Sequence, residues 1–169
     1  GTVTVQGTQG FDTLQFITDG YELTGGTLAI APATGSTGTL SVDGGVTVTI
    51  GSVIADGSGP SGLAKIGGGT AVLTGVNTYS GGTSITGGTL SVSSDGNLGA
   101  ASGGLSIGGG TLATTASFTS QRVVTLTGAA GIDVGFATTL TLAGTISGAG
   151  GLVKLGYGTL VLAGANTYE

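Results

Sequence analysis

The chain has 169 residues and a net charge of −5; it contains 39 glycines, and only 7% of its residues are charged. Ordinary globular domains have about 7% glycine and about 25% charged residues, so the composition is not that of an average globular domain. A hydrophobic content of 38% argues against a disordered chain, and irregular glycine spacing with two prolines excludes collagen. Three basic residues, Lys65, Arg122 and Lys154, are too few for a phosphate-binding surface, so we expect no nucleic-acid partner.

The chain contains no cysteine and no histidine. This excludes a disulfide framework, a nucleophile activated by histidine, and the usual zinc ligand sets. The opening residues do not form a signal peptide, and no apolar run approaches the roughly 18 residues of a membrane helix. We therefore expect no membrane insertion by this segment, and we expect it to come from within a larger precursor or to be mature.

The first recognisable pattern lies at residues 7–15, GTQGFDTLQ, which match the calcium-binding nonapeptide GGxGxDxUx except at Thr8. That motif binds Ca²⁺ when several copies stack, and the next nine residues do not repeat it. We therefore expect a turn that leads into a strand, with Phe11 or Leu14 pointing inward. A calcium-ordered solenoid built around Asp12 stays open as an alternative.

Further along the chain, glycine turns alternate with short runs in which aliphatic residues alternate with Thr or Ser, the period-two signature of strands. Units that cannot bury their own apolar face must stack on copies of themselves. Over residues 1–169 we predict a single all-β domain, a parallel β-solenoid, in preference to a β-sandwich or propeller. At roughly 20 residues per turn it would have about eight turns and be on the order of 40 Å long. The predicted strand units lie at 24–30, 37–42, 46–50, 86–92, 108–114, 123–127 and 139–142.

One block of eighteen residues occurs twice, at 62–79 and at 151–168, 89 positions apart. It begins GLAKIG in the first copy and GLVKLG in the second, and both copies end in NTY. The block, which continues to residue 83 in the first copy, resembles the passenger-associated transport repeat of autotransporters. Ala71 departs from the repeat's usual Leu, which the second copy has as Leu160.

The resemblance implies a right-handed parallel β-helix of the pertactin type, from a passenger displayed at the bacterial surface. It implies export across the outer membrane through a C-terminal β-barrel that this chain lacks. The implied function is a structural or adhesive stalk, with a role in secretion and folding of the passenger. Its partners would be host-cell or matrix molecules, or another passenger copy. We expect no enzyme activity, no cofactor and no metal, and the sequence assigns no catalytic or binding residue.

Within the block, we expect the aliphatic side chains to point inward and the lysines to cover apolar surface with their stems while their amines stay in water. Asn77 suits a turn, and repeated Asn or Tyr residues could stack on neighbouring turns of the solenoid. The residues predicted to point inward are Leu63, Ile66, Val72 and Leu73. The two lysines are Lys65 and Lys154.

A polysaccharide-cleaving enzyme stays open as a second alternative, because stacked turns could bring two carboxylates within the roughly 5–10 Å that such chemistry needs. No tryptophan is present to stack on sugar, and most of the acids lie beside Gly or Ser, so we expect solvated turn residues. The acids considered are Asp12, Asp19, Glu22, Asp43, Asp56, Asp95 and Asp133. Three Thr-x-Thr segments, at 47–49, 125–127 and 139–141, lack the constant spacing of an ice-binding array and are interpreted as outward residues of strands.

Overall fold

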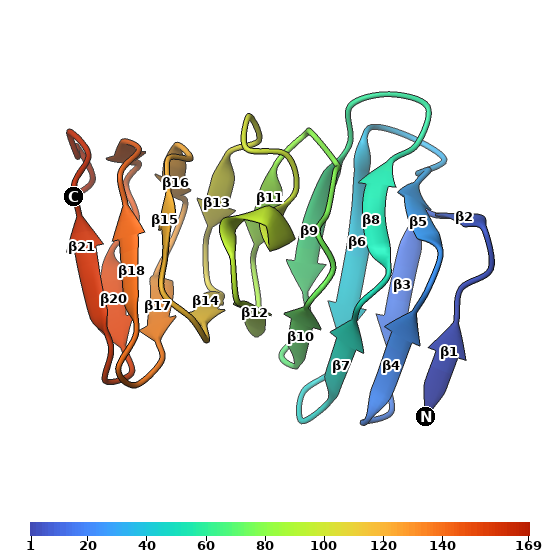
Figure 1. Cartoon of the computed structure of the whole chain (residues 1–169). Helices are drawn as coiled ribbons and strands as arrows, with labels where there is room; N and C mark the ends of the chain where they lie inside the picture. Colours follow the sequence, from blue (N-terminus) through green and yellow to red (C-terminus); the bar gives the residue numbers. More distant parts are fainter.

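A computed structural model describes residues 1–169 as a stack of short strands with a single 3-10 helix, η1 (Asp95–Leu98). All the strand pairings are parallel, and the two termini lie at opposite ends of the stack (Figure 1). The strands are β1 (Thr2–Thr4), β2 (Thr8–Phe11), β3 (Thr13–Phe16), β4 (Tyr21–Thr24), β5 (Thr27–Ile30), β6 (Thr37–Val42), β7 (Thr47–Ile50), β8 (Val53–Asp56), β9 (Gly62–Ile66), β10 (Thr70–Leu73), β11 (Thr83–Ile85), β12 (Thr89–Val92), β13 (Leu105–Ile107), β14 (Thr111–Thr114), β15 (Phe118–Ser120), β16 (Val124–Leu126), β17 (Ala130–Val134), β18 (Thr139–Leu142), β19 (Ile146–Ser147), β20 (Leu152–Leu155) and β21 (Thr159–Leu162).

The strands form three faces of a solenoid. Sheet A has eight strands in the order β1-β4-β7-β10-β12-β14-β17-β20, and sheet C has seven in the order β3-β6-β9-β11-β13-β16-β19. The third face carries two shorter sheets, sheet B (β2-β5-β8) and sheet D (β15-β18-β21). Each turn runs from sheet A across the third face to sheet C. The chain therefore makes seven complete turns and part of an eighth, close to the predicted eight.

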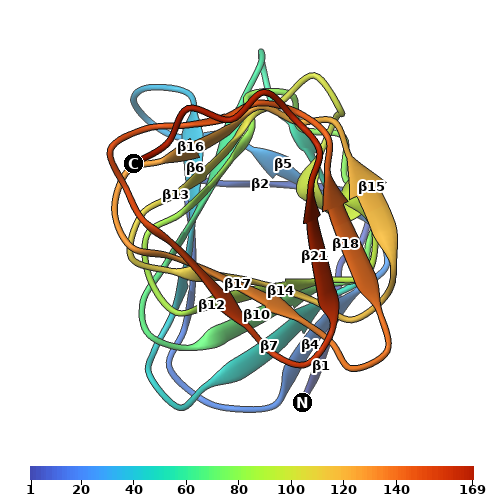
Figure 2. The same ribbon diagram turned by 90° about the vertical axis from the view of Figure 1, so that its left-hand side faces the viewer.

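The handedness can be followed in Figure 2, where the C-terminal end faces the viewer. The chain passes from sheet A at the bottom to the third face at the right, over the top and down to sheet C at the left, while it advances toward the viewer. This is a right-handed coil. The predicted fold, a right-handed parallel β-helix, is confirmed.

The third face is interrupted in the middle of the stack. Between β8 and β15 no strand lies on it; it is formed in turn 4 by residues 74–82 and in turn 5 by residues 93–104, which include η1. Regular strand ladders are absent from this stretch, and only scattered backbone hydrogen bonds join its turns, such as Thr78 N to the Ile54 carbonyl oxygen at 2.8 Å and Ala100 N to the Tyr79 carbonyl oxygen at 2.9 Å. Its remaining polar groups need other partners, and these include the buried side chains described below.

The core is one continuous cluster of mainly aliphatic side chains, in register from turn to turn. One ladder of sheet A, for example, runs through Leu23, Ile50, Leu73 and Val92. Strand alternation fixes which residues join such ladders, and it corrects two predictions. Leu63 and Leu73 are buried as expected, but Ile66 is 37% exposed and Val72 is half-buried on the outer face, because each is one residue out of phase with the inward positions.

Glycine fixes the corner between sheets C and A. Gly67 has φ +77°, and a Cβ there would stand 2.3 Å from the carbonyl oxygen of Val42 in the turn before. A Cβ on Gly69 would stand 2.2 Å from the carbonyl oxygen of Asp43. Neighbouring turns therefore approach more closely at this corner than any residue with a side chain allows.

Candidate interaction surfaces and the buried polar groups of the repeat

Lys65 lies inside the solenoid, contrary to the prediction that its amine stays in water. It takes the inward position in β9 that Leu40 takes in β6 and Ile85 in β11, and its side chain is 0% exposed. Its Nζ donates to the carbonyl oxygens of Ile66 at 2.8 Å and Gly67 at 3.0 Å, and to that of Gly87 in the next turn at 3.2 Å. All three ammonium donors are satisfied without a carboxylate. Burial lowers the pKa of Lys65 to about 8.

Asn77 is also buried and is not a left-handed turn residue, since Ala137 is the only non-glycine residue with positive φ. Its Oδ1 accepts from the Ile54 amide at 2.8 Å in the preceding turn, and its Nδ2 donates to the Asn97 carbonyl at 2.6 Å in the following one. Asn97 in turn donates to the Gly75 carbonyl at 2.9 Å. Stacked asparagines thus add side-chain hydrogen bonds to the few backbone bonds between turns where the third face has no strand.

Tyr79 fills the core beside these asparagines and is 0% exposed. Its hydroxyl lies 2.7 Å from Oγ1 of Thr83, the only side chain that bonds it. Burial raises the pKa of Tyr79 to about 12, although Thr83 and the charge of Arg122 act in the opposite direction. Asn77 and Tyr79, the ends of the NTY sequence, therefore act structurally.

Arg122 is a buried residue that sequence reasoning did not single out. Its guanidinium forms the only ion pair in the structure, with Nε 2.9 Å from Oδ1 of Asp95. The remaining donors bond the carbonyl oxygens of Asp95, Gly99, Ala100 and Gly103 at 2.7–3.0 Å. Arg122 lies in turn 6 and these acceptors lie in turn 5, so one side chain fastens the η1 loop to the next turn. No local pattern links residue 122 to residues 95–103, and only stacking brings them together.

Among the other carboxylates, Asp56 is held by hydrogen bonds from two serines. Burial acts to raise the pKa of Asp56, but hydrogen bonds from the Ser80 hydroxyl and the Ser80 and Ser61 amides outweigh it, and the pKa is lowered. Asp12, the sixth residue of the nonapeptide match, is exposed. No three acids gather closely enough to hold a metal ion, and none of the three surface depressions is lined by Asp or Glu.

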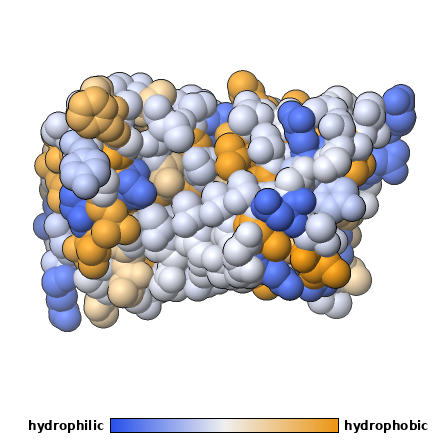
Figure 3. Space-filling view, turned by 90° about the horizontal axis from the view of Figure 1, so that it is seen from below, coloured by the Kyte–Doolittle hydropathy of each residue, from blue (hydrophilic) through white to orange (hydrophobic).

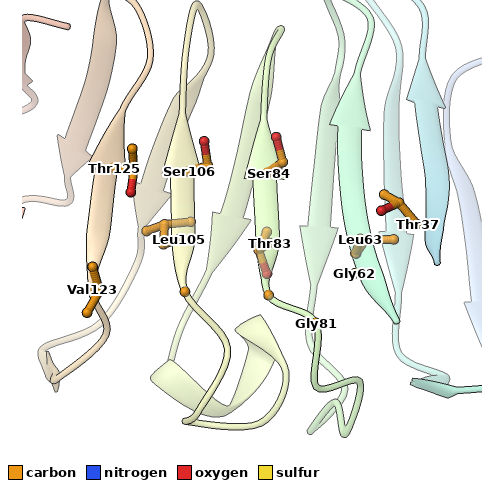
Figure 4. Close-up of a pocket in the computed structure, with 12 residues that line it drawn as sticks. Thr37, Gly62, Leu63, Gly81, Thr83, Ser84, Leu105, Ser106, Val123 and Thr125 are labelled. Atoms are coloured by element: carbon orange, nitrogen blue, oxygen red, sulfur yellow. The ribbon is translucent and has the colours of Figure 1, made fainter. Parts of the chain in front are cut away.

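The outer side of sheet C carries mostly small uncharged residues. One position per turn lies in register along it, occupied by Thr39, Ala64, Ser84, Ser106 and Thr125. A shallow depression of about 270 Å³ is lined by residues of five turns, with Ser84, Ser106 and Thr125 along its length and Gly62 and Gly81 at one edge (Figure 4). It offers hydroxyls and backbone groups but no titratable side chain.

The outer side of sheet A carries a second hydroxyl ladder, formed by Thr47, Thr70, Thr89 and Thr111. Much of the middle of this side is pale on the hydropathy scale, neither strongly hydrophilic nor strongly hydrophobic (Figure 3). The three Thr-x-Thr segments fall on different faces, in β7 of sheet A, β16 of sheet C and β18 of sheet D, so they form no single array. No helix in the structure has the length and apolarity to cross a bilayer.

Comparison with known proteins agrees with this architecture. The passenger-associated-transport-repeat family matches residues 63–92 and 152–169, close to the predicted blocks. The chain is 47% identical over 169 residues to "Adhesin BmaC autotransporter" of Brucella suis biovar 1 (strain 1330), a match that covers 97% of the chain but about 5% of that relative. No solved structure matches. The chain is therefore a segment of an autotransporter passenger that carries passenger-associated transport repeats, a class of protein found in the secreted or cell-surface fraction.

Proposed function

We propose that this segment is a rigid, non-catalytic part of a surface stalk that also makes adhesive contacts. The observation that carries the proposal is the continuous core, whose side chains stay in register from turn to turn along sheets A and C. A stack in which each turn is fixed by its neighbours extends in one direction and keeps its width. Such a body is suited to holding other parts of a passenger away from the cell.

The adhesive part of the proposal follows from the outer faces of sheets A and C. They present rows of hydroxyls at the spacing of adjacent strands, about 4.8 Å, without a deep pocket. Contacts of that kind add up over a large area rather than concentrating in one site. The partners proposed are host-cell or matrix molecules, or a neighbouring passenger copy. The name of the Brucella relative, an adhesin, supports this direction.

A role in secretion is part of the same proposal. Each added turn buries aliphatic side chains against the turn before it, so folding outside the cell can proceed one turn at a time. Burial of each turn would oppose return of the chain across the outer membrane. Export itself would depend on a separate translocation domain of the passenger's parent protein.

The proposal excludes catalysis, and two features support that exclusion. The buried charged residues Lys65 and Arg122 are saturated by internal carbonyl and carboxylate groups, so neither is free to act on a substrate. The surface depressions carry no carboxylate, whereas polysaccharide cleavage needs two beside the sugar.

The test is to couple the segment to beads and to score attachment to host cells and matrix proteins, and clumping between beads. Beads that carry a Leu73→Asp variant, expected not to fold, serve as the control. Attachment or clumping that needs the folded segment supports the adhesive role, and inert beads would refute it. A parallel incubation with acidic polysaccharides should release no reducing or unsaturated ends; turnover that is lost on changing one Asp would refute the non-catalytic assignment.

A further inference from the structure

Two aromatic rings stand almost fully in solvent at one corner of the solenoid. The chain has only eight Phe and Tyr residues, and most of them contribute to the core. Phe136 is 83% exposed and Tyr157 is 92% exposed. Phe136 follows β17 and Tyr157 follows β20, strands that pair in sheet A, so the two rings occupy the same corner of consecutive turns.

Neither ring is explained by packing. Tyr157 corresponds in sequence to Gly68 of the first repeat copy, but Gly68 lies at the corner between sheets C and A, whereas Tyr157 lies at the corner between sheet A and the third face. Phe136 lies on a turn beside Ala137, the only non-glycine residue with a left-handed backbone, φ 57°. Strained turns persist where the surroundings hold them and are frequent at functional sites. Exposed aromatic residues also dominate the energetics of many interfaces.

A carboxylate lies against the same corner. Asp133 points outward from β17, and its Oδ1 occupies the space beside Gly156 that a Cβ would fill, next to Tyr157 in the chain. It accepts no hydrogen bond from the rest of the chain and forms no ion pair. The corner therefore combines two exposed rings with one unpartnered negative charge.

The charge of the whole surface indicates what this corner attracts. Lys65 is buried and Arg122 is paired with Asp95, while Lys154, the one exposed basic side chain, donates to carbonyls of its own turn. Seven of the eight acids have no ion-pair partner. The surface is therefore anionic, and complementary partners are cationic.

We propose that the corner formed by Phe136, Tyr157 and Asp133 binds Lys or Arg side chains of a basic polypeptide partner. Cations bind over aromatic faces through the ring quadrupole, and the Asp133 carboxylate adds a charge-assisted contact. The inference deepens the proposed adhesive function and rests on it, since it names the class of partner for one of the segment's surfaces.

The test is binding of a fluorescently labelled peptide of alternating Lys and Gly, followed by anisotropy at low salt. We expect saturable binding, which Phe136→Ala with Tyr157→Ala weakens roughly tenfold. Phe136→Leu with Tyr157→Leu keeps apolar surface but removes the ring faces, and should weaken binding nearly as much. Asp133→Asn should weaken it more than Asp43→Asn, a matched control that removes an exposed acid at a different corner. Circular dichroism checks that all variants fold.

Equal effects of Asp133→Asn and Asp43→Asn, with no effect of the ring substitutions, would mean general attraction to an anionic surface and would overturn the proposal. Preferential binding to phosphatidylcholine vesicles over the peptide would also overturn it. If beads still attach to host surfaces after both rings are removed, the adhesive function is supported but the role of this corner is contradicted. Failure of the further inference can therefore be told apart from failure of the proposed function.

Discussion

The two copies of the repeat have nearly the same sequence but different surroundings. In the first copy Lys65 is fully buried and bonds three carbonyl oxygens, the third of them contributed by the next turn. In the second copy Lys154 is exposed and bonds two, those of Leu155 and Gly156 in its own turn. Likewise Asn77 bonds turns on both sides, whereas Asn166 bonds only the Ile146 amide of the turn before it. The repeat therefore supplies the hydrogen-bond donors, the lysine and the asparagine. Neighbouring turns bury these side chains and contribute the third acceptor of the lysine.

The largest effect is expected from a charge placed in the core of the first copy. Leu73→Asp puts a carboxylate where the side chain is 1% exposed, and should destabilise the segment by at least about 4 kcal/mol. Leu162, at the matching position of the second copy, is only half-buried. Leu162→Asp should therefore lower the free energy of unfolding clearly less than Leu73→Asp does. Urea unfolding followed by circular dichroism measures both, and equal losses would contradict the role given to neighbouring turns.

The next effect concerns the two lysines. Lys65→Met keeps most of the volume but leaves three buried carbonyls without their donor, and should cost about 1–3 kcal/mol. Lys154→Met should change the free energy of unfolding by less than about 0.5 kcal/mol, because solvent can replace its bonds. A Lys65→Met variant as stable as the parent would show that the ammonium contributes nothing net, as some buried charges do.

A smaller effect is expected from pH. Because the pKa of Lys65 falls to about 8 in the folded chain, the unfolded state binds more protons above that pH, and stability should rise from about pH 8 toward pH 10. Hydrogen bonds to three carbonyls favour the ammonium and should keep the rise modest. The pKa of Tyr79 is raised to about 12, so the unfolded state loses its proton first, and stability should fall between pH 10 and 12. Thermal unfolding midpoints across this range test both signs, and Lys65→Met should abolish the rise while Tyr79→Phe abolishes the corresponding fall.

Metal ions are expected to have no effect on thermal stability. The acids lie apart and the Asp12 nonapeptide is not repeated, so melts with excess chelator or with calcium should superimpose. A calcium-dependent rise of several degrees, lost in Asp12→Asn, would show that ions as well as neighbouring turns hold the stack together.

Periodicity carried most of the fold prediction, because glycine corners and alternating strands repeat often enough to define a solenoid. It failed where the phase of the alternation decides which side chain points inward. In GLAKI the lysine and not the isoleucine points inward, since Leu63 fixes the phase and Ile66 is an odd number of residues away. Residue type alone predicts the opposite, because isoleucine is often buried and lysine almost never is. The Arg122 contacts and the placement of Phe136 and Tyr157 at one corner depend on which turns stack, and local sequence does not contain that information.

The interrupted third face has a mechanical consequence. Pulling the ends of a stacked coil loads the bonds between turns one row at a time, so the rod should yield by peeling, turn after turn, at modest force. Arg122 changes this at one level, because its six hydrogen bonds join turn 6 to the η1 loop of turn 5. They must break nearly together, since one rigid guanidinium makes them all. Under load, peeling should pause between these two turns, and a stretched segment should keep a partly unwound length before it gives way.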